Sequence, residues 1–208
     1  MINVSIAGIG GQGSVLAARI LAQAAEAKGW QVRSAETIGM AQRGGDVMSH
    51  VRMGNAGEEV FSPLPAKGTV DVLIALEPGE AARALPYLKE NGLLVVASTG
   101  IPPVMANFKR QTYDPQHLID DMQAAGVKMV VVDDAELVHR LGEPKALNVM
   151  MLAYAIIAVN KREDCMDNAL RGAITLEDIE AAIPLCVKRK LVSVNEKAIK
   201  VVQQVARV

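Results

Sequence analysis

A glycine-rich turn near the start of the chain has the residue types and spacing of an anion-binding loop. Its glycines follow the pattern Gly8-x-Gly10-x-x-Gly13, between a short apolar run and a run with helical periodicity. Glycine permits a tight turn and a close approach of the backbone to a ligand. The first turn of the following helix offers unpaired N–H groups and partial positive charge, which stabilise a phosphate or carboxylate without a basic side chain. The alternative is that the glycines only let the helix pack closely against the sheet.

Two polar residues belong to the same turn. Gln12 carries an amide that can hydrogen-bond either a ligand or a neighbouring loop. Ser14 can cap the helix or contact a phosphate. Both readings stay open for each residue on the sequence alone.

A second glycine-rich segment, residues 39–46 (GMAQRGGD), places Arg43 beside Gly44 and Gly45. A guanidinium binds phosphate or carboxylate through two parallel hydrogen bonds, whereas the alternative is a surface arginine in a tight turn. The segment follows the second predicted strand, so we expect it at the carboxyl ends of the strands, where open α/β sheets bind ligands. Two candidate anion-binding elements therefore converge on one edge of the sheet.

Glu36 gives the chain a partial likeness to a nicotinamide dinucleotide site. It stands near the end of the second predicted strand, where such folds place an acid that holds the ribose hydroxyls. However, a glycine-rich loop and a hairpin follow it instead of the next helix–strand unit. His50, His117 and His139 stand in separate segments and are interpreted as structural or surface residues. A stand-alone nicotinamide- or nucleotide-binding Rossmann-like protein remains an alternative.

No catalytic set can be assembled from neighbouring motifs. The sequence offers no acid–base pair, no nucleophile–base pair and no group of metal ligands. We therefore expect no catalytic residue and no metal site in this chain. Three classes stay open: a subunit active only in a complex, a self-sufficient nicotinamide- or flavin-dependent oxidoreductase, and a protein that binds a small anion without reaction.

The elements that must position these loops alternate between strand and helix. Apolar runs bounded by turn residues predict strands, and a period of 3.6 residues with glycine or proline at the ends predicts helices. Strands are predicted at residues 3–7, 31–35, 47–53, 59–61, 70–76, 93–97 and 128–132. Helices are predicted at residues 14–28, 78–89, 116–125, 135–141, 145–159 and 190–205, and another starts at a capping box over residues 175–178.

This order predicts an α/β fold with a doubly wound, mostly parallel sheet. Residues 47–53 and 59–61 are predicted to form an antiparallel hairpin inserted into it, across the turn at residues 55–57. Only helices follow residue 145, so the carboxyl-terminal region is predicted to be helical. We expect a single domain over residues 1–208, with the helical extension beginning near residue 145.

The charge balance and the hydropathy exclude several partners. The 22 basic and 23 acidic residues give a net charge of −1, so the chain lacks the excess of positive charge that binds nucleic acid or an anionic membrane. The longest apolar run, residues 149–159, is shorter than the roughly 20 residues that a bilayer requires. Residues 1–7 lack the basic segment of a secretory signal, and Cys165 and Cys186 form no CxxC pair or iron–sulfur spacing. We expect a cytoplasmic protein in a reducing compartment.

The two glycine-rich segments, with Ser49-His-Val-Arg52 after them, resemble the gamma domain of the 2-oxoacid:ferredoxin oxidoreductases. Within that family, the motif Gly39-Met-Ala-Gln-Arg-Gly-Gly45 is most similar to the corresponding motif in beta subunits of the indolepyruvate branch. Leu76-Glu77-Pro78, Glu80 and Asn148 also stand where similar segments are expected. The resemblance covers about the whole chain in order and length.

The resemblance implies a non-autonomous enzyme subunit, with no activity from this chain alone. A large (alpha) partner subunit would carry thiamine diphosphate and the iron–sulfur clusters. The complex would decarboxylate indolepyruvate or another aryl 2-oxoacid, pass the electrons to ferredoxin and transfer the acyl group to coenzyme A. A gamma subunit of a pyruvate or other 2-oxoacid oxidoreductase is the alternative within the family. Expressed alone, the chain is expected to form a homodimer through the apolar surface that the large subunit covers.

The resemblance also implies a ligand for the two loops, which is coenzyme A. Arg43 would face the same ligand or the partner's active site. Asp46 departs from the family pattern, in which a small hydroxyl residue is common, and its carboxylate can pair with Arg43 and weaken the hold on an anion. The residues assigned to the ligand are Gly8, Gly10, Gly11, Gln12, Gly13, Ser14, Arg43, Gly44 and Gly45.

Overall fold

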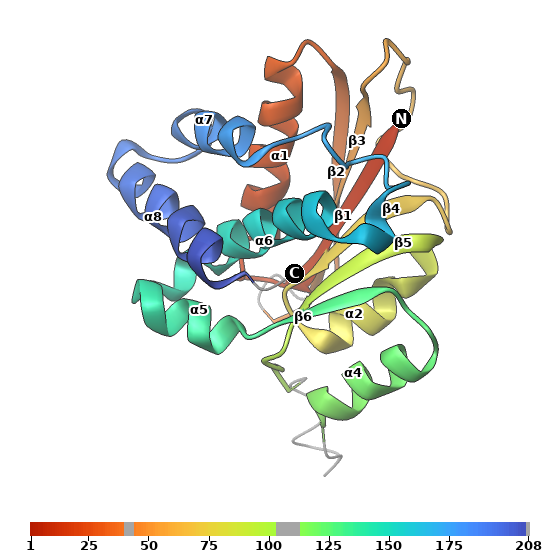
Figure 1. Cartoon of the computed structure of the whole chain (residues 1–208), viewed down its shortest axis with the longest axis vertical. Helices are drawn as coiled ribbons and strands as arrows, with labels where there is room; N and C mark the ends of the chain where they lie inside the picture. Colours follow the sequence, from red (N-terminus) through yellow and green to blue (C-terminus); the bar gives the residue numbers. More distant parts are fainter. Residues whose placement is uncertain (40–43, 103–112, 207–208) are drawn as a thin grey trace.

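The computed structural model describes residues 1–39, 44–102 and 113–206, which form a six-stranded sheet with helices on both faces (Figure 1). The strands are β1 (Ile2–Ile9), β2 (Gln31–Ile38), β3 (Asp46–Gly54), β4 (Val70–Ala75), β5 (Leu88–Ala97) and β6 (Met129–Val132). Their order in the sheet is β2-β3-β1-β4-β5-β6. The strands β1, β4, β5 and β6 run parallel, whereas β3 runs antiparallel to both of its neighbours. The predicted mostly parallel sheet with an antiparallel insertion is confirmed, but the hairpin is formed by other residues than predicted.

The helices divide between the two faces of the sheet, as Figure 1 shows. One face is covered by α1 (Ser14–Ala27) and α6 (Leu147–Lys161), with α7 (Leu176–Cys186) and α8 (Arg189–Val205) packed outside them. The other face is covered by α2 (Pro78–Ala84) and α4 (Pro115–Ala124). The remaining α-helix, α5 (Asp134–Leu141), packs against α6 and α8. The connection after β1 and the connection after β4 thus cross opposite faces, which makes the fold doubly wound.

The carboxyl-terminal helices follow from their sequence patterns. The apolar run in α6 is buried on all sides, because α6 lies between the sheet and the outer helices. The capping box at the start of α7 is confirmed: the Thr175 hydroxyl accepts from the Asp178 N–H at 3.3 Å, and the Asp178 carboxylate accepts from the Thr175 N–H at 2.9 Å. The helical region predicted after residue 145 is therefore confirmed.

The predicted strand at residues 59–61 is wrong. The antiparallel partners of β3 are β1 and β2, so no ladder position beside it is left for the returning segment. Side chains hold that segment instead, since Gln31 accepts from the Val60 N–H and Arg33 donates to the Val60 carbonyl at 3.4 Å. Phe61 is consequently 86% exposed. The antiparallel hairpin of this fold is β2–β3.

The helix predicted at residues 78–89 ends earlier than expected. The α-helix stops at Ala84, a 3-10 turn covers Leu85–Tyr87, and β5 begins at Leu88. Pro86 explains the change, because it lacks the N–H that would continue the hydrogen-bond ladder of the α-helix. Further 3-10 turns cover Pro144–Ala146 and Glu163–Cys165.

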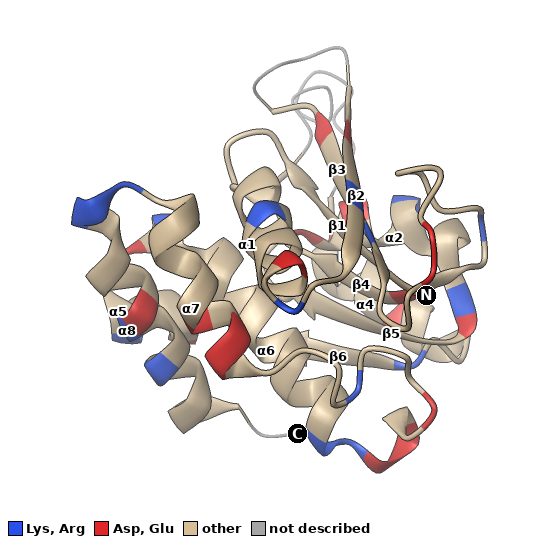
Figure 2. Cartoon of the chain, turned by 90° about the horizontal axis from the view of Figure 1, so that it is seen from above, with Lys and Arg blue, Asp and Glu red and all other residues tan. Residues whose placement is uncertain are grey.

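The outer surface carries charges of both signs. Figure 2 shows lysine and arginine interspersed with aspartate and glutamate along the helices and strands. Among the residues that the structure describes, no helix combines the length and the apolar character needed to cross a bilayer.

Candidate functional site

The glycine loop (residues 8–13) connects the end of β1 to the start of α1. Gly11 and Gly13 have φ angles of 110° and 86°, in the left-handed region where side chains are disfavoured. Gly13 is the N-cap of α1, and no side chain caps this helix. The backbone path of the turn therefore requires glycine at both positions.

Gly13 is also pressed against α6 through Asn148. The Asn148 side chain is 2% exposed, and its Nδ2 donates to the Gly13 carbonyl at 2.8 Å. A Cβ added at Gly13 would overlap that amide nitrogen. Close packing therefore requires glycine at position 13, although the neighbour is α6 and not the sheet, and Asn148 joins the residues that build the loop.

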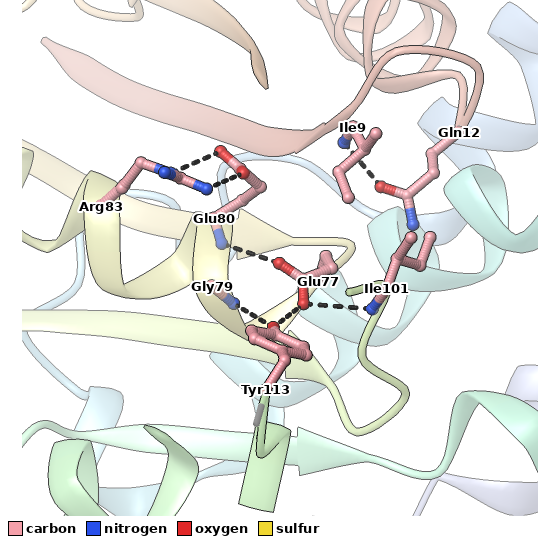
Figure 3. A network of polar contacts seen from close by, with 8 residues as sticks. All are labelled: Ile9, Gln12, Glu77, Gly79, Glu80, Arg83, Ile101 and Tyr113. Carbon is pink, nitrogen blue, oxygen red and sulfur yellow. Dashed lines mark hydrogen bonds and ion pairs between the residues drawn. The ribbon is translucent and has the colours of Figure 1, made fainter. Parts of the chain in front are cut away.

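Gln12 binds its own protein through both side-chain atoms. Its Oε1 accepts from the Ile9 N–H at 2.7 Å (Figure 3). Its Nε2 donates to the Leu76 carbonyl at 2.9 Å. Ile9 ends β1, and Leu76 follows β4. These neighbouring strands send their connections to opposite faces, and their carboxyl ends frame the crevice in which such folds bind ligands. Gln12 spans that crevice. The sequence left either a ligand or a neighbouring loop as the partner of its amide, and in the structure the amide binds the neighbouring loop.

The glycine loop and the Arg43 loop (residues 39–46) meet at the same edge. The Gly10 N–H donates to the Gly45 carbonyl at 2.8 Å. Gly44 is exposed and has a φ angle of 75°. Arg43 itself lies outside the described residues. The predicted convergence of the two segments is confirmed for the Gly10–Gly45 contact.

Gly8 and Ser14 are buried at the two ends of the glycine loop. Ser14 is 2% exposed, and a Cβ at Gly8 would lie 3.0 Å from Gln12 Oε1 and 3.2 Å from Leu76 Cβ. Both residues therefore face the protein interior. Gly11, in contrast, is exposed, and a Cβ there would meet no atom within 4 Å.

A cavity of about 260 Å³ opens beside the two loops. Its walls come from the end of β1, the Arg43 loop, the start of α2, and both ends of the connection between β5 and α4. The lining residues are Ile9, Gly44, Gly45, Asp46, Glu77, Gly79, Glu80, Arg83, Ile101, Pro102 and Tyr113. Glu77, Arg83 and Tyr113 were not among the residues assigned to the ligand from the sequence. Glu77 could have been identified as a candidate site residue from the sequence, because it is an acid that directly follows the predicted buried strand at residues 70–76.

Two carboxylates of the cavity are buried and bonded differently (Figure 3). Glu80 pairs with Arg83 at 2.7 Å, and this bond raises the pKa of the guanidinium, to which the charge of Asp46 adds. Glu77 accepts from the Glu80 N–H at 3.0 Å, from the Ile101 N–H at 3.3 Å and from the Tyr113 hydroxyl. Burial and the bond to Glu77 raise the pKa of Tyr113 well above its ordinary value.

Glu36 does not lie where a dinucleotide fold needs its acid. It lies on β2, and β3 separates that strand from β1, so about 10 Å of sheet lies between the two. The register pairs Glu36 with Ser49 and Ser49 with Ile6, which places Glu36 level with the middle of β1 rather than beyond its end. The structure does not bring Glu36 and the glycine loop together.

The histidines lie apart from one another. His50 is buried on β3, with its Nδ1 2.8 Å from Ser5 Oγ, and burial lowers its pKa. His117 and His139 are exposed on α4 and α5. Within residues 1–39, 44–102 and 113–206, no three histidine, cysteine, aspartate or glutamate side chains form a group that could hold a metal ion.

Comparison with known proteins gives one consistent result. The family model described as pyruvate ferredoxin/flavodoxin oxidoreductase matches residues 3–207. Indolepyruvate oxidoreductase subunit IorB of Archaeoglobus fulgidus is 32% identical over 200 residues, which cover 96% of this chain and 92% of the relative. The match is thus almost complete in both sequences.

Solved structures show the same fold. The gamma subunit of a keto/oxoacid ferredoxin oxidoreductase from Geobacter sulfurreducens superposes with a TM-score of 0.65 at 21% identity, covering 98% of this chain and 97% of that one. The 2-oxoglutarate:ferredoxin oxidoreductase from Magnetococcus marinus, with 2-oxoglutarate, coenzyme A and succinyl-CoA bound, has a TM-score of 0.68 at 15% identity. It covers 99% of this chain and 31% of that chain, so the fold is a part of a longer polypeptide there.

Proposed function

This chain belongs to the pyruvate ferredoxin/flavodoxin oxidoreductase family, and on that premise we propose that it is the small subunit of an indolepyruvate-type 2-oxoacid:ferredoxin oxidoreductase. The observation that carries the proposal is the 32% identity to subunit IorB, which extends over 96% of this chain. A match of this length extends over both loops and the helical region of this chain. We propose residues 1–208 as a single domain of this type.

In the proposed complex, a 2-oxoacid and coenzyme A give an acyl-coenzyme A, carbon dioxide and a proton, and the two electrons released pass to ferredoxin. The large subunit would hold thiamine diphosphate, which supplies the stabilised carbanion for decarboxylation, and the iron–sulfur clusters, which carry the electrons. This chain would contribute binding surface and no catalytic residue. Its proposed location is the cytoplasm.

The contacts divide the proposed ligand residues into two groups. Gly8, Gly10, Gln12 and Ser14 build the loop, since each is buried or bonded within the protein. Gly11 and Gly44 are exposed at the edge of the sheet. We assign the coenzyme A contact to Gly11, Arg43 and Gly44. Gly13 and Gly45 join the residues that build the loops, because their carbonyls accept hydrogen bonds from Asn148 and Gly10. The coenzyme A bound to the Magnetococcus marinus enzyme supports this ligand class.

Co-expression with a large subunit tests the subunit assignment. We expect a stable complex that reduces a dye or ferredoxin when given indolepyruvate and coenzyme A, whereas this chain alone shows no turnover. Failure of the two chains to co-purify would contradict the proposal. A complex that prefers pyruvate over indolepyruvate would support the alternative within the family, and a yellow protein with flavin absorbance would support a self-sufficient oxidoreductase.

Titration calorimetry of the complex with coenzyme A tests the ligand contact. Gly11→Val and Arg43→Ala are expected to weaken binding at least about tenfold, which corresponds to roughly 1.4 kcal/mol. Gly57→Val is the matched control, because Gly57 also has a positive φ angle (77°) and open space around it, but lies in the turn after β3. Equal affinity in the wild type, Gly11→Val and Arg43→Ala would remove the assignment.

A further inference from the structure

One buried carboxylate ties together three segments around the cavity. Glu77 is 2% exposed and lies two residues beyond the end of β4. Its Oε2 accepts from the Glu80 N–H, at the start of α2. Its Oε1 accepts from the Ile101 N–H and the Tyr113 hydroxyl, which belong to the two ends of the connection between β5 and α4 (Figure 3).

Tyr113 extends this arrangement across the cavity wall. Its hydroxyl accepts from the Gly79 N–H at 3.1 Å while it donates to Glu77. The ring fits only because two neighbours lack side chains: a Cβ at Gly100 would lie 2.7 Å from Tyr113 Cε1, and a Cβ at Gly79 would lie 3.1 Å from its hydroxyl oxygen. The ring therefore has one well-defined place, which the Glu77 carboxylate fixes.

The groups that Glu77 holds are wall residues of the cavity beside Gly44 and Gly45. Burying a carboxylate is costly unless donors compensate it, and Arg83 binds Glu80 rather than Glu77. Three donors from the surrounding segments surround Glu77 instead. Their bonds set the distance between the start of α2 and the two ends of the connection between β5 and α4, and that distance determines the shape of the cavity.

We infer that Glu77 is a positioning residue, which acts through Ile101 and Tyr113 to shape the cavity for the ligand of the two loops. The ligand's identity as coenzyme A rests on the proposed function, whereas the arrangement of the wall does not. Glutamine cannot replace Glu77 here. Both carboxylate oxygens accept hydrogen bonds, so in either orientation the amide nitrogen of a glutamine would face a donor.

The test uses the complex with its large subunit and three variants. Glu77→Gln and Tyr113→Phe are expected to raise the KM for coenzyme A about tenfold with kcat within about twofold of the wild type, as loss of binding contacts predicts. Asp71→Asn is the control, because Asp71 is a buried, hydrogen-bonded carboxylate at the opposite end of β4. It is expected to leave the KM unchanged. Equal KM values in the wild type, Glu77→Gln and Tyr113→Phe would overturn the inference.

A spectroscopic measurement tests the hydrogen bonds of Glu77 to Tyr113 and Ile101 without any ligand. Tyrosinate absorbance in the Glu77→Gln chain should appear at lower pH than in the wild type, because Tyr113 no longer donates to a carboxylate. Amide exchange at Ile101 and Gly79 should accelerate in the same variant and not in Asp71→Asn. Unchanged titration and exchange in Glu77→Gln would overturn the inference. A wild-type complex without coenzyme A-dependent turnover would instead contradict the proposed function.

Discussion

Replacing Gly13 by alanine is expected to lower the free energy of unfolding by about 2–4 kcal/mol. Two costs add at this position. The backbone has a φ angle of 86°, which costs an L-residue roughly 1–2 kcal/mol. The new methyl group would also overlap Asn148 Nδ2 and break its 2.8 Å bond to the Gly13 carbonyl, leaving buried polar groups unpaired. Urea unfolding followed by circular dichroism measures the loss.

Gly29→Ala separates the two costs. Gly29 has a φ angle of 77°, and a Cβ there would meet no atom within 4 Å, so only the backbone cost of about 1–2 kcal/mol applies. Adding Asn148→Ala to Gly13→Ala should remove the overlap, and the double variant should be less unstable than the sum of the two single changes. Equal losses in Gly13→Ala and Gly29→Ala would show that the contact with Asn148 does not matter.

Most of the fold could be predicted from local patterns, and its strand order could not. Apolar runs and capping residues gave the parallel strands and the carboxyl-terminal helices, because period and end signals are properties of contiguous residues. The position of β3 between β1 and β2 depends on pairing over long sequence separations. The sequence pattern predicted an antiparallel partner of β3 at residues 59–61, since a tight turn follows β3, whereas its antiparallel partners are β1 and β2. This pairing also separates Glu36 from the glycine loop.

The candidate site shows the same limit. The glycine spacing predicted the loop, because glycine is required where φ is positive or a neighbour approaches closely. The partners of that loop were harder to predict: Asn148 and Leu76 contact it from distant parts of the chain. Tyr113 stood in a proline-rich stretch with no pattern of its own, and only the fold brings it to Glu77.

Gln12→Glu is expected to destabilise the protein by about 2–4 kcal/mol near neutral pH. One new carboxylate oxygen can still accept from the Ile9 N–H. The other would take the place of Nε2, which lies 2.9 Å from the Leu76 carbonyl oxygen, so two acceptors would face each other in a half-buried site. Gln116→Glu is the matched control, because the Gln116 amide donates to Asp120 on an exposed turn of α4, and its change should cost less than about 0.5 kcal/mol.

The loss in Gln12→Glu should depend on pH with a definite sign. Repulsion by the Leu76 carbonyl raises the pKa of the new carboxyl group in the folded state above its unfolded value of about 4.3. Below that value the protonated acid donates to Leu76 as the amide does, so the variant should lie closest to the wild type there and lose stability as the pH rises through the folded pKa. Unfolding measured from about pH 4 to pH 8 checks this trend. A difference in the free energy of unfolding that does not change with pH would contradict this trend. It would mean that the stabilisation by Gln12 does not depend on donation to the Leu76 carbonyl.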